Sequence, residues 1–373
     1  MTTDSLLIQK RADLKRRLAS GEYKTLVDVV LEWFEQLLRK FIRQAKPLPL
    51  WVTSTALVLI MSVAGFSTIY LTDNLFVVTP SLNQLSLLIN FLIIALFGGQ
   101  AIISSIAINQ LIRSHFSLLN DMVLDAIESA KSMDDIKNWL EMTCNKQYHL
   151  LVAIIGGVSA GLYARSLLNA SLFLFIGNGA AFIIIIFSIF STVFLQLLFM
   201  ILILSGRLGK YHLKLFTPDP SNSELIFQLS NKLNLVVYFV GVYAAVMTFV
   251  FVESKFFTSA GIFLVLILWL PLIALFILNQ TSLTSIIRRA KWKTLNEIQA
   301  QVEELRATGS LKDKDTIEAI NRLMDFHDRV KATRNSAVDL RTVLNFINSL
   351  LLPLLAFLLG NLDKVIALFS KTP

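Results

Sequence analysis

The chain has 373 residues, and its composition excludes an ordinary soluble protein. Hydrophobic residues make up 55% of the chain and charged residues only 16%, with a mean hydropathy of +0.64 and a formal net charge of +8. Soluble domains average roughly 25% charged residues, so this deficit indicates a chain whose solvent is mostly lipid. Cys144 is the single cysteine, which excludes an intramolecular disulfide. We therefore expect an all-α fold, a polytopic helical membrane bundle.

The amino-terminal segment, residues 1–47, predicts basic amphipathic helices on the cytoplasmic side. It contains no apolar signal-peptide core, so we expect the first span to act as its own uncleaved insertion signal. Pro47 and Pro49 are expected to end the second helix of this segment. That helix either lies on the lipid headgroups or packs on other cytoplasmic helices. Its apolar stripe at helical spacing consists of Val27, Val30, Phe34, Leu37 and Phe41.

Seven apolar stretches have the length of a membrane-spanning helix, which needs about 20 residues to cross roughly 30 Å of hydrocarbon. They are Leu50–Leu71, Leu85–Ile108, His149–Leu168, Gly179–Leu204, Leu233–Val252, Ser259–Leu278 and Thr342–Gly360. The sequence therefore predicts seven transmembrane helices. Residues 48–281 form a six-helix transmembrane core with cytoplasmic helical loops at 113–148 and 207–232.

The distribution of arginine and lysine predicts the orientation of these spans. The segment before the first span holds ten of them, the loops after spans two and four hold four each, and residues 282–341 hold twelve. These segments place 30 of the 34 basic residues on one side of the membrane. Because cytoplasmic loops keep an excess of positive charge, we expect the amino terminus inside and the carboxyl terminus outside.

The last apolar stretch, Thr342–Gly360, leaves two alternatives open. Twelve basic residues precede it and two follow it, which favours a seventh, proline-kinked crossing within residues 342–373. The competing interpretation is a re-entrant or interfacial hairpin that is broken at Pro353.

Residues 282–341 predict a cytoplasmic helical hairpin. Leu295, Ile298, Val302 and Leu305 form a short heptad-like seam, and Gly309 marks the end of that helix. The second helix is expected to carry Ile317, Ile320, Met324 and Phe326. In the loop 113–148, Ser132 with Asp135 has the spacing of a capping box at a helix start.

Catalytic and metal-binding signatures are absent from the sequence. The four histidines, His115, His149, His212 and His327, are far apart and lack metal ligands at useful spacing. Cys144 has no neighbouring histidine motif, so an inert packing role is favoured over a nucleophile. We expect no catalytic residue, no metal and no cofactor, and the protein is predicted not to be an enzyme.

A few polar or bent positions inside the spans are the candidate pore or gating residues. They lie in spans two, six and seven: Gln100 and Ser104, Trp269 and Pro271, and Asn345, Asn348, Ser349 and Pro353. The polar residues of span two either join helices by hydrogen bonds or follow a water-filled path. The two prolines either bend helices that the cytoplasmic hairpin moves or are simple packing kinks.

Span three carries two further features. Gly156, Gly157, Ala160 and Gly161 are small residues at four-residue spacing, which predicts close helix packing. Arg165, near the outer end of the span, is the one Asp, Glu, Lys or Arg residue inside the predicted spans, and His149 opens the same span. It either reaches the outer headgroups or attracts anions at a pore mouth. No carboxylate lies at midplane depth, which argues against proton coupling.

Two functions fit these observations. The first is a passive channel or permease that uses no midplane carboxylate, and the alternative is a membrane-embedded scaffold or signalling protein acting through its basic cytoplasmic helices. In topology alone, with the amino end inside and the polar mass cytoplasmic, the layout resembles seven-span ligand-gated cation channels of the insect chemoreceptor type. That resemblance implies ion conduction and assigns no residue.

The composition also predicts partners and location. The expected partners are the lipid bilayer, anionic headgroups contacted by the basic segments, and a second copy of the chain or a cytoplasmic protein. Nucleic acid is not expected. Compact loops favour an integral multi-pass protein of the plasma (inner) membrane of a bacterium.

The seventh crossing is directly testable. We predict that alkaline phosphatase, which is active only outside the cytoplasm, is active when fused after Pro373, because the last span carries it across. An inactive phosphatase fusion together with a fluorescent cytoplasmic reporter at the same position would instead indicate the re-entrant hairpin.

Overall fold

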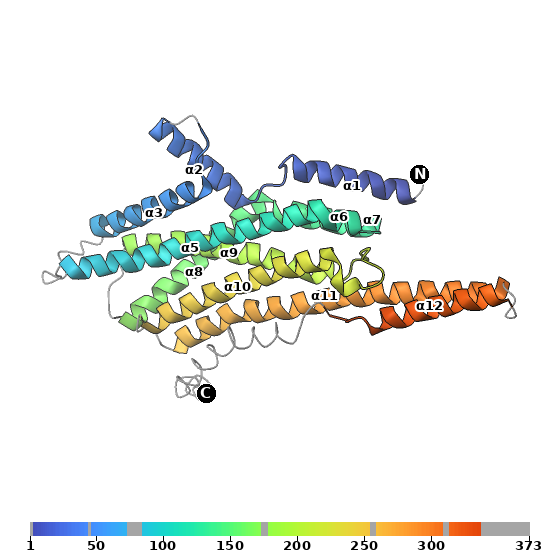
Figure 1. The fold of residues 1–373 in the computed structure, drawn as a ribbon. Helices are drawn as coiled ribbons and strands as arrows, with labels where there is room; N and C mark the ends of the chain where they lie inside the picture. The colour runs from blue at the N-terminus through green and yellow to red at the C-terminus, as the bar shows by residue number, and fades with distance from the viewer. Residues whose placement is uncertain are drawn as a thin grey trace.

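The computed structural model describes residues 3–43, 46–72, 84–172, 178–253, 259–308 and 313–336, and these are almost entirely helical. The long helices run side by side along one direction (Figure 1). In chain order the elements are α1 (Thr3–Ala19), α2 (Leu26–Ile42), α3 (Leu50–Thr72), α5 (Gln84–Leu118), the π-helical turn η1 (Leu119–Val123), α6 (Leu124–Ala126), α7 (Ala130–Thr143), α8 (Lys146–Leu172), α9 (Asn178–Leu208), the 3-10 turn η2 (Pro220–Asn222), α10 (Glu224–Glu253), α11 (Ser259–Thr308) and α12 (Lys314–Ala332).

The prediction of an all-helical chain with membrane-spanning character is confirmed at a coarse level. Six of the seven apolar stretches lie within α3, α5, α8, α9, α10 and α11. Among the described residues, three segments are long and apolar enough to cross a membrane, and they are Ile184–Leu208, Glu224–Thr248 and Trp269–Thr308. Leu50–Gly65 is a shorter apolar helix. The seventh stretch, Thr342–Gly360, lies outside the described residues.

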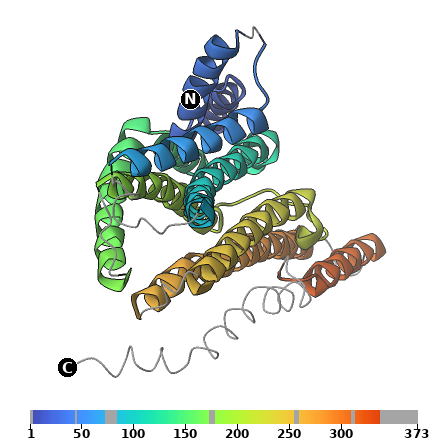
Figure 2. The same ribbon diagram turned by 90° about the vertical axis from the view of Figure 1, so that its left-hand side faces the viewer.

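Helix α9 is the centre of the bundle, since it packs against α3, α5, α8 and α11. Viewed from the end, α10 and α11 lie beside each other on the side of the bundle away from α3 (Figure 2). The closest approach is between α8 and α9, where glycines of α8 face the backbone of α9. A Cβ atom on Gly157 would lie 2.6 Å from the Ile189 Cα atom, and one on Gly161 would lie 2.8 Å from the Ile185 Cα atom. Only glycine allows this contact.

Large apolar side chains also cover much of the outside of the bundle. They lie on five of the long helices, including Leu59 and Val63 of α3, Ile155 and Leu162 of α8, Phe199 of α9, Val242 of α10, and Leu270 and Ile277 of α11. Large exposed apolar side chains on this many helices are compatible with helices that lie in a membrane.

Helix α2 divides into a packed half and an exposed half. Val27 and Phe34 are buried, as expected from the stripe, but Leu37 is exposed and Phe41 is 89% exposed. The predicted stripe is therefore wrong beyond Phe34. Leu38 still packs partly against the core, and the end of α2 points away from the bundle (Figure 1). The helix ends at Ile42, where Arg43 adopts a left-handed conformation.

Helix α7 begins earlier than the capping box predicts. Its N-cap is Ser129, and Ser132 lies buried inside the helix. The preceding residues are held by a backbone pairing with the loop after α9, in which Lys214 N–H donates to the Ala126 carbonyl at 2.7 Å. This tertiary pairing places the helix start, so the local Ser132 and Asp135 pattern does not operate.

Helices α11 and α12 form a hairpin whose interior contains the predicted seam. Leu295, Ile298 and Val302 of α11 are buried against Ile320 and Val330 of α12. Helix α12 carries Ile317, Ile320, Met324 and Phe326 as predicted. Its buried face runs through Ile320, Leu323 and Phe326, whereas Ile317 and Met324 are exposed.

A buried lysine fixes the base of this hairpin. The Lys291 ammonium donates to the carbonyls of Lys331 (2.8 Å) and Thr333 (2.7 Å) and to the Asn335 side chain (2.9 Å). A cation at the carboxyl end of α12 also complements the helix dipole. All three ammonium protons are therefore used to hold α12 against α11.

The glycine contact between α8 and α9 generates a stability prediction. We expect Gly157→Val to lower the free energy of unfolding by about 1–3 kcal/mol, because the added atoms meet the α9 backbone. The matched variant Ala160→Val adds methyl groups on the same helix at an exposed position, and it should change stability little. Equal losses in both variants, measured by unfolding in mixed detergent micelles, would contradict the packing role.

Candidate functional site

The polar elements gather at one end of the long helices (Figure 1). We call this region the polar layer, and it comprises α1, α6, α7, α12, the loop 209–223 and the second half of α11. Its helices are tied to one another by exposed ion pairs, such as Lys10 with Asp134 at 2.7 Å and Lys15 with Asp125 at 2.7 Å. Ion pairs exposed in this way contribute little stability each. The buried contacts therefore decide how this layer is held.

A buried polar cluster outside this layer lies between α2 and α5. Asp28 accepts from the Asn109 amide at 2.6 Å and from the Arg113 Nε atom at 2.7 Å, both on one carboxylate oxygen. Its other oxygen accepts from the Thr25 backbone N–H at 3.0 Å. The Thr25 hydroxyl donates to Asn109 at 2.6 Å. Thr25, Asp28 and Asn109 are all buried.

The Asp28 carboxylate has two structural roles in this cluster. Thr25 and Asp28 form a capping box that begins α2, and the same Asp28 attaches α2 to the end of α5. A buried charge is tolerated only when it is paired and hydrogen-bonded. The start of α2 is therefore locked to α5.

Two contacts attach the polar layer to the bundle. The Trp139 indole of α7 is fully buried and donates to the Met200 carbonyl of α9 at 2.8 Å. His149, at the start of α8, is buried between the Met142 carbonyl at 3.1 Å and the Gln196 side chain at 2.7 Å. Movement of α7 would therefore break a hydrogen bond to the central helix.

The candidate pore residues that the structure describes lie at helix contacts. Ser104 is buried, and its neighbour Ser105 donates to the Phe190 carbonyl of α9 at 2.7 Å. The Trp269 indole donates to the Thr248 hydroxyl of α10 at 3.0 Å. These hydrogen bonds join neighbouring helices, which fits the packing alternative. Pro271 lies inside α11, two residues after Trp269.

Other predicted residues receive less description. Gln100 lies half-buried in α5. Gly156 approaches Thr192 of α9, whereas Ala160 is exposed. Arg165 belongs to α8, but its side chain lies outside the described part of the chain, as do Asn345, Asn348, Ser349 and Pro353 in full.

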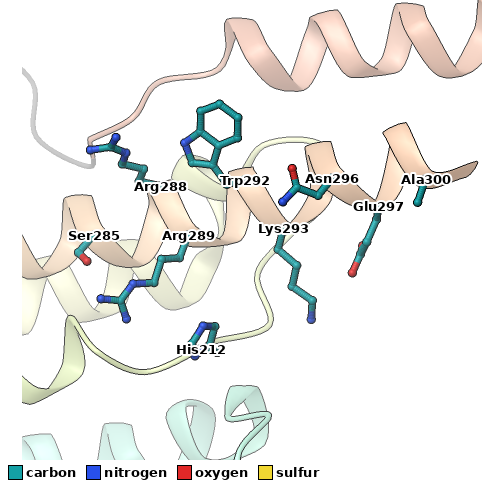
Figure 3. Close-up of a pocket in the computed structure, with 9 residues that line it drawn as sticks. All are labelled: His212, Ser285, Arg288, Arg289, Trp292, Lys293, Asn296, Glu297 and Ala300. Atoms are coloured by element: carbon teal, nitrogen blue, oxygen red, sulfur yellow. The ribbon is translucent and has the colours of Figure 1, made fainter. Parts of the chain in front are cut away.

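The candidate site is a basic groove in the polar layer, with a volume of about 760 Å³. It lies between α11 and the loop after α9, and we call it the basic groove. Figure 3 shows Arg289 and Lys293 directed toward the loop that carries His212, with Arg288 and Trp292 on the other side of α11. The lining residues are His212, Ser285, Arg288, Arg289, Trp292, Lys293, Asn296, Glu297 and Ala300.

The basic side chains of this groove differ in whether they have a hydrogen-bond or ion-pair partner. The Lys293 ammonium contacts both carboxylate oxygens of Glu128 at 2.8 Å. Among the described residues, Arg288 and Arg289 form neither a hydrogen bond nor an ion pair, and Arg288 is exposed. Glu297 is the one carboxylate that lines the groove. Within the described ranges, the groove therefore presents two guanidinium groups that have no anionic partner.

The wall of the groove is held rigidly. The Glu128 N–H donates to the His212 carbonyl at 3.3 Å, next to the bridge between Ile127 and Leu213. On the other side, the Ser285 hydroxyl of α11 donates to the Gly209 carbonyl at 3.0 Å. The loop is thus fixed at both ends, and His212 is presented on a defined backbone.

The remaining titratable groups that the structure describes do not form a reactive site. Burial raises the pKa of the Cys144 thiol to about 12, so it is a protonated packing residue at neutral pH. Burial lowers the pKa of His115, whose Nδ1 atom donates to the Leu111 carbonyl, so its imidazole is neutral. Within the described ranges, no group of three or more His, Cys, Asp or Glu residues is placed to hold a metal ion.

The cluster at Asp28 generates a quantitative prediction. We expect Asp28→Ala to lower the free energy of unfolding by about 2–4 kcal/mol, because Asn109 and Arg113 lose a buried anionic partner. The control Asp13→Ala removes an exposed partner of Arg16, and it should cost less than about 0.5 kcal/mol. A loss at Asp28 no larger than the loss at Asp13 would refute the locking role.

Comparison of this chain with protein-family models, with curated proteins and with solved structures finds no match in any of the three. The contacts of its own residues are therefore the basis for assigning a function.

Proposed function

We propose that this chain is a multi-pass integral membrane protein without enzymatic activity, which signals or recruits partners through its polar layer on the cytoplasmic side. Three apolar helices and the exposed apolar side chains around the bundle support the membrane location. The asymmetry of the basic residues supports a cytoplasmic position for the polar layer. A bacterial plasma membrane is the proposed location.

The observation that carries this proposal is the continuity of α11. It is one helix of 50 residues, from Ser259 to Thr308, and is therefore about 75 Å long. Its first half is apolar, and its second half forms a wall of the basic groove and the hairpin with α12. A change at the groove is therefore transmitted along a single element into the bundle.

Helix α2 supports a second contact with the membrane. Trp33, Leu37 and Phe41 are exposed on its second half, next to Arg39 and Lys40. Apolar side chains flanked by cations suit the boundary between acyl chains and anionic headgroups. We propose that this half of α2 lies on the cytoplasmic leaflet.

A passive channel or permease is the second candidate function, and one observation favours it. Among the described residues, the side-chain oxygen of Asn279 and both polar atoms of the Gln280 amide are buried without a hydrogen-bond partner. Both follow Pro271 in α11. Polar groups at this position suit a water or ion path at the cytoplasmic end of the predicted span six.

Flux measurements separate the two functions. We predict no ion flux above that of protein-free liposomes for the reconstituted chain, and no difference between the wild type and Asn348→Leu. Flux that is abolished by Asn348→Leu but kept in the control Asn335→Leu would overturn the proposal in favour of the channel. The cytoplasmic role additionally predicts that a soluble partner binds only to inside-out vesicles.

A further inference from the structure

Two grooves of the polar layer differ in how their cations are satisfied. The groove between α1 and α7, of about 620 Å³, is lined by Lys10, Arg16 and Lys137. Each of these is paired with a carboxylate of Asp134, Asp13 or Glu141. The basic groove instead contains Arg288 and Arg289 without a described partner, as given above. Cationic hydrogen-bond donors that line a groove without a partner can bind an anion.

We propose that the basic groove binds a small phosphate monoester. Arg289 and His212 supply donors directed into the same space, and Lys293 supplies a third after it exchanges Glu128 for the phosphate (Figure 3). This inference deepens the proposed function by naming its ligand class, and it rests on that function only for the side of the membrane from which the ligand arrives.

The composition of the groove favours a phosphate ester over other anions. A phosphate monoester carries close to two negative charges and three acceptor oxygens, which match several charge-assisted donors better than one carboxylate does. The volume of about 760 Å³ suits a small molecule and not a folded domain.

Glu128 competes with an anionic ligand for Lys293 and so weakens binding to the basic groove. Its carboxylate holds Lys293 at 2.8 Å, in the position of an internal competitor for an anionic ligand. The Lys293 side chain is about half exposed, so the pair is screened by water and exchanges at low cost. Removing the Glu128 charge should therefore strengthen binding, whereas removing a groove cation should weaken it.

The depth of the groove favours a free ester over a lipid headgroup. The Asn279 amide donates to the Leu233 carbonyl at 3.2 Å, which places the predicted cytoplasmic ends of spans five and six at one level. Arg289 follows Asn279 by ten residues, or about 15 Å along the helix. The polar headgroup layer is only about 5–8 Å thick on each side. The guanidinium thus lies beyond the phosphates of simple lipids.

Equilibrium dialysis of the full chain tests this inference with glycerol 3-phosphate as the probe. Against the wild type, we expect Arg289→Gln and Lys293→Gln each to raise the Kd about tenfold, and Glu128→Gln to lower it about threefold or more. Arg306→Gln makes the same charge change at an exposed position farther along α11, and it should leave the Kd unchanged. The gain expected for Glu128→Gln cannot arise from misfolding.

Phosphatidic acid in phosphatidylcholine nanodiscs distinguishes the source of the phosphate. Retention of this lipid with the same variant pattern, but no binding of glycerol 3-phosphate, supports the groove with a lipid ligand. Failure of both probes to bind at about 10 mM, or equal losses in Arg289→Gln and Arg306→Gln, overturns the inference. Binding to the groove only from the external face of sealed vesicles would instead refute the proposed function and leave the groove assignment intact.

Discussion

The proposed membrane location imposes one constraint on the structure, which is that a backbone in lipid must satisfy its own hydrogen bonds. Long uninterrupted helices are the solution here, and α11 is the longest of them, with 50 residues. Helix α11 continues past its apolar half without a described break. The same helix therefore belongs both to the apolar bundle and to the polar layer. Lys291 then fixes α12 to that helix with three hydrogen bonds. The hairpin and its groove therefore move only with α11.

The polar layer is coupled to the bundle by a small number of buried contacts. Trp139 connects α7 to α9, and His149 of α8 contacts the Met142 carbonyl of α7. Outside the polar layer, Asp28 connects α2 to α5. Each uses a side chain that is nearly inaccessible to solvent, where an unsatisfied polar group is costly. Such contacts are either fully formed or broken, which suits the transmission of a binding event. The glycine contact between α8 and α9 supplies the rigid reference against which such movement occurs.

Local sequence pattern predicted where the helices lie. Three-dimensional contacts determined where some of them begin and which of their side chains are buried. Apolar length placed six helices correctly, and heptad spacing identified Leu295, Ile298 and Val302 as a buried seam. The same reasoning failed at Phe41, because the packed face of α2 continues through Leu38 and not through Leu37 and Phe41. It also failed at Ser132, because a loop pairing sets the start of α7. Hydrophobic periodicity predicts which face of a helix is apolar, but it does not predict how much of that face contacts a neighbouring helix.

The candidate site was not visible in the sequence for a related reason. Asp28 and Asn109 are 81 residues apart, and Lys293 and Glu128 are 165 residues apart. No spacing rule joins positions at such separations. The local signals that existed were the run Arg288 to Lys293, which mixes four cations with Trp292, and Asn109 at the end of an apolar stretch. The first signal indicates a basic surface, but only the fold adds His212 and Glu128 to it.

The most direct measurement is the depth of α11 in a bilayer, obtained by electron paramagnetic resonance of single nitroxide labels at Leu270, Ile277, Thr281 and Arg288. All four positions are exposed on this helix. The account predicts high oxygen accessibility and low accessibility to a water-soluble nickel complex at Leu270 and Ile277. It predicts the reverse at Arg288, with the change near Thr281. Access of the nickel complex to Leu270 and Ile277 equal to that at Arg288 would show that α11 does not enter lipid and would contradict the account.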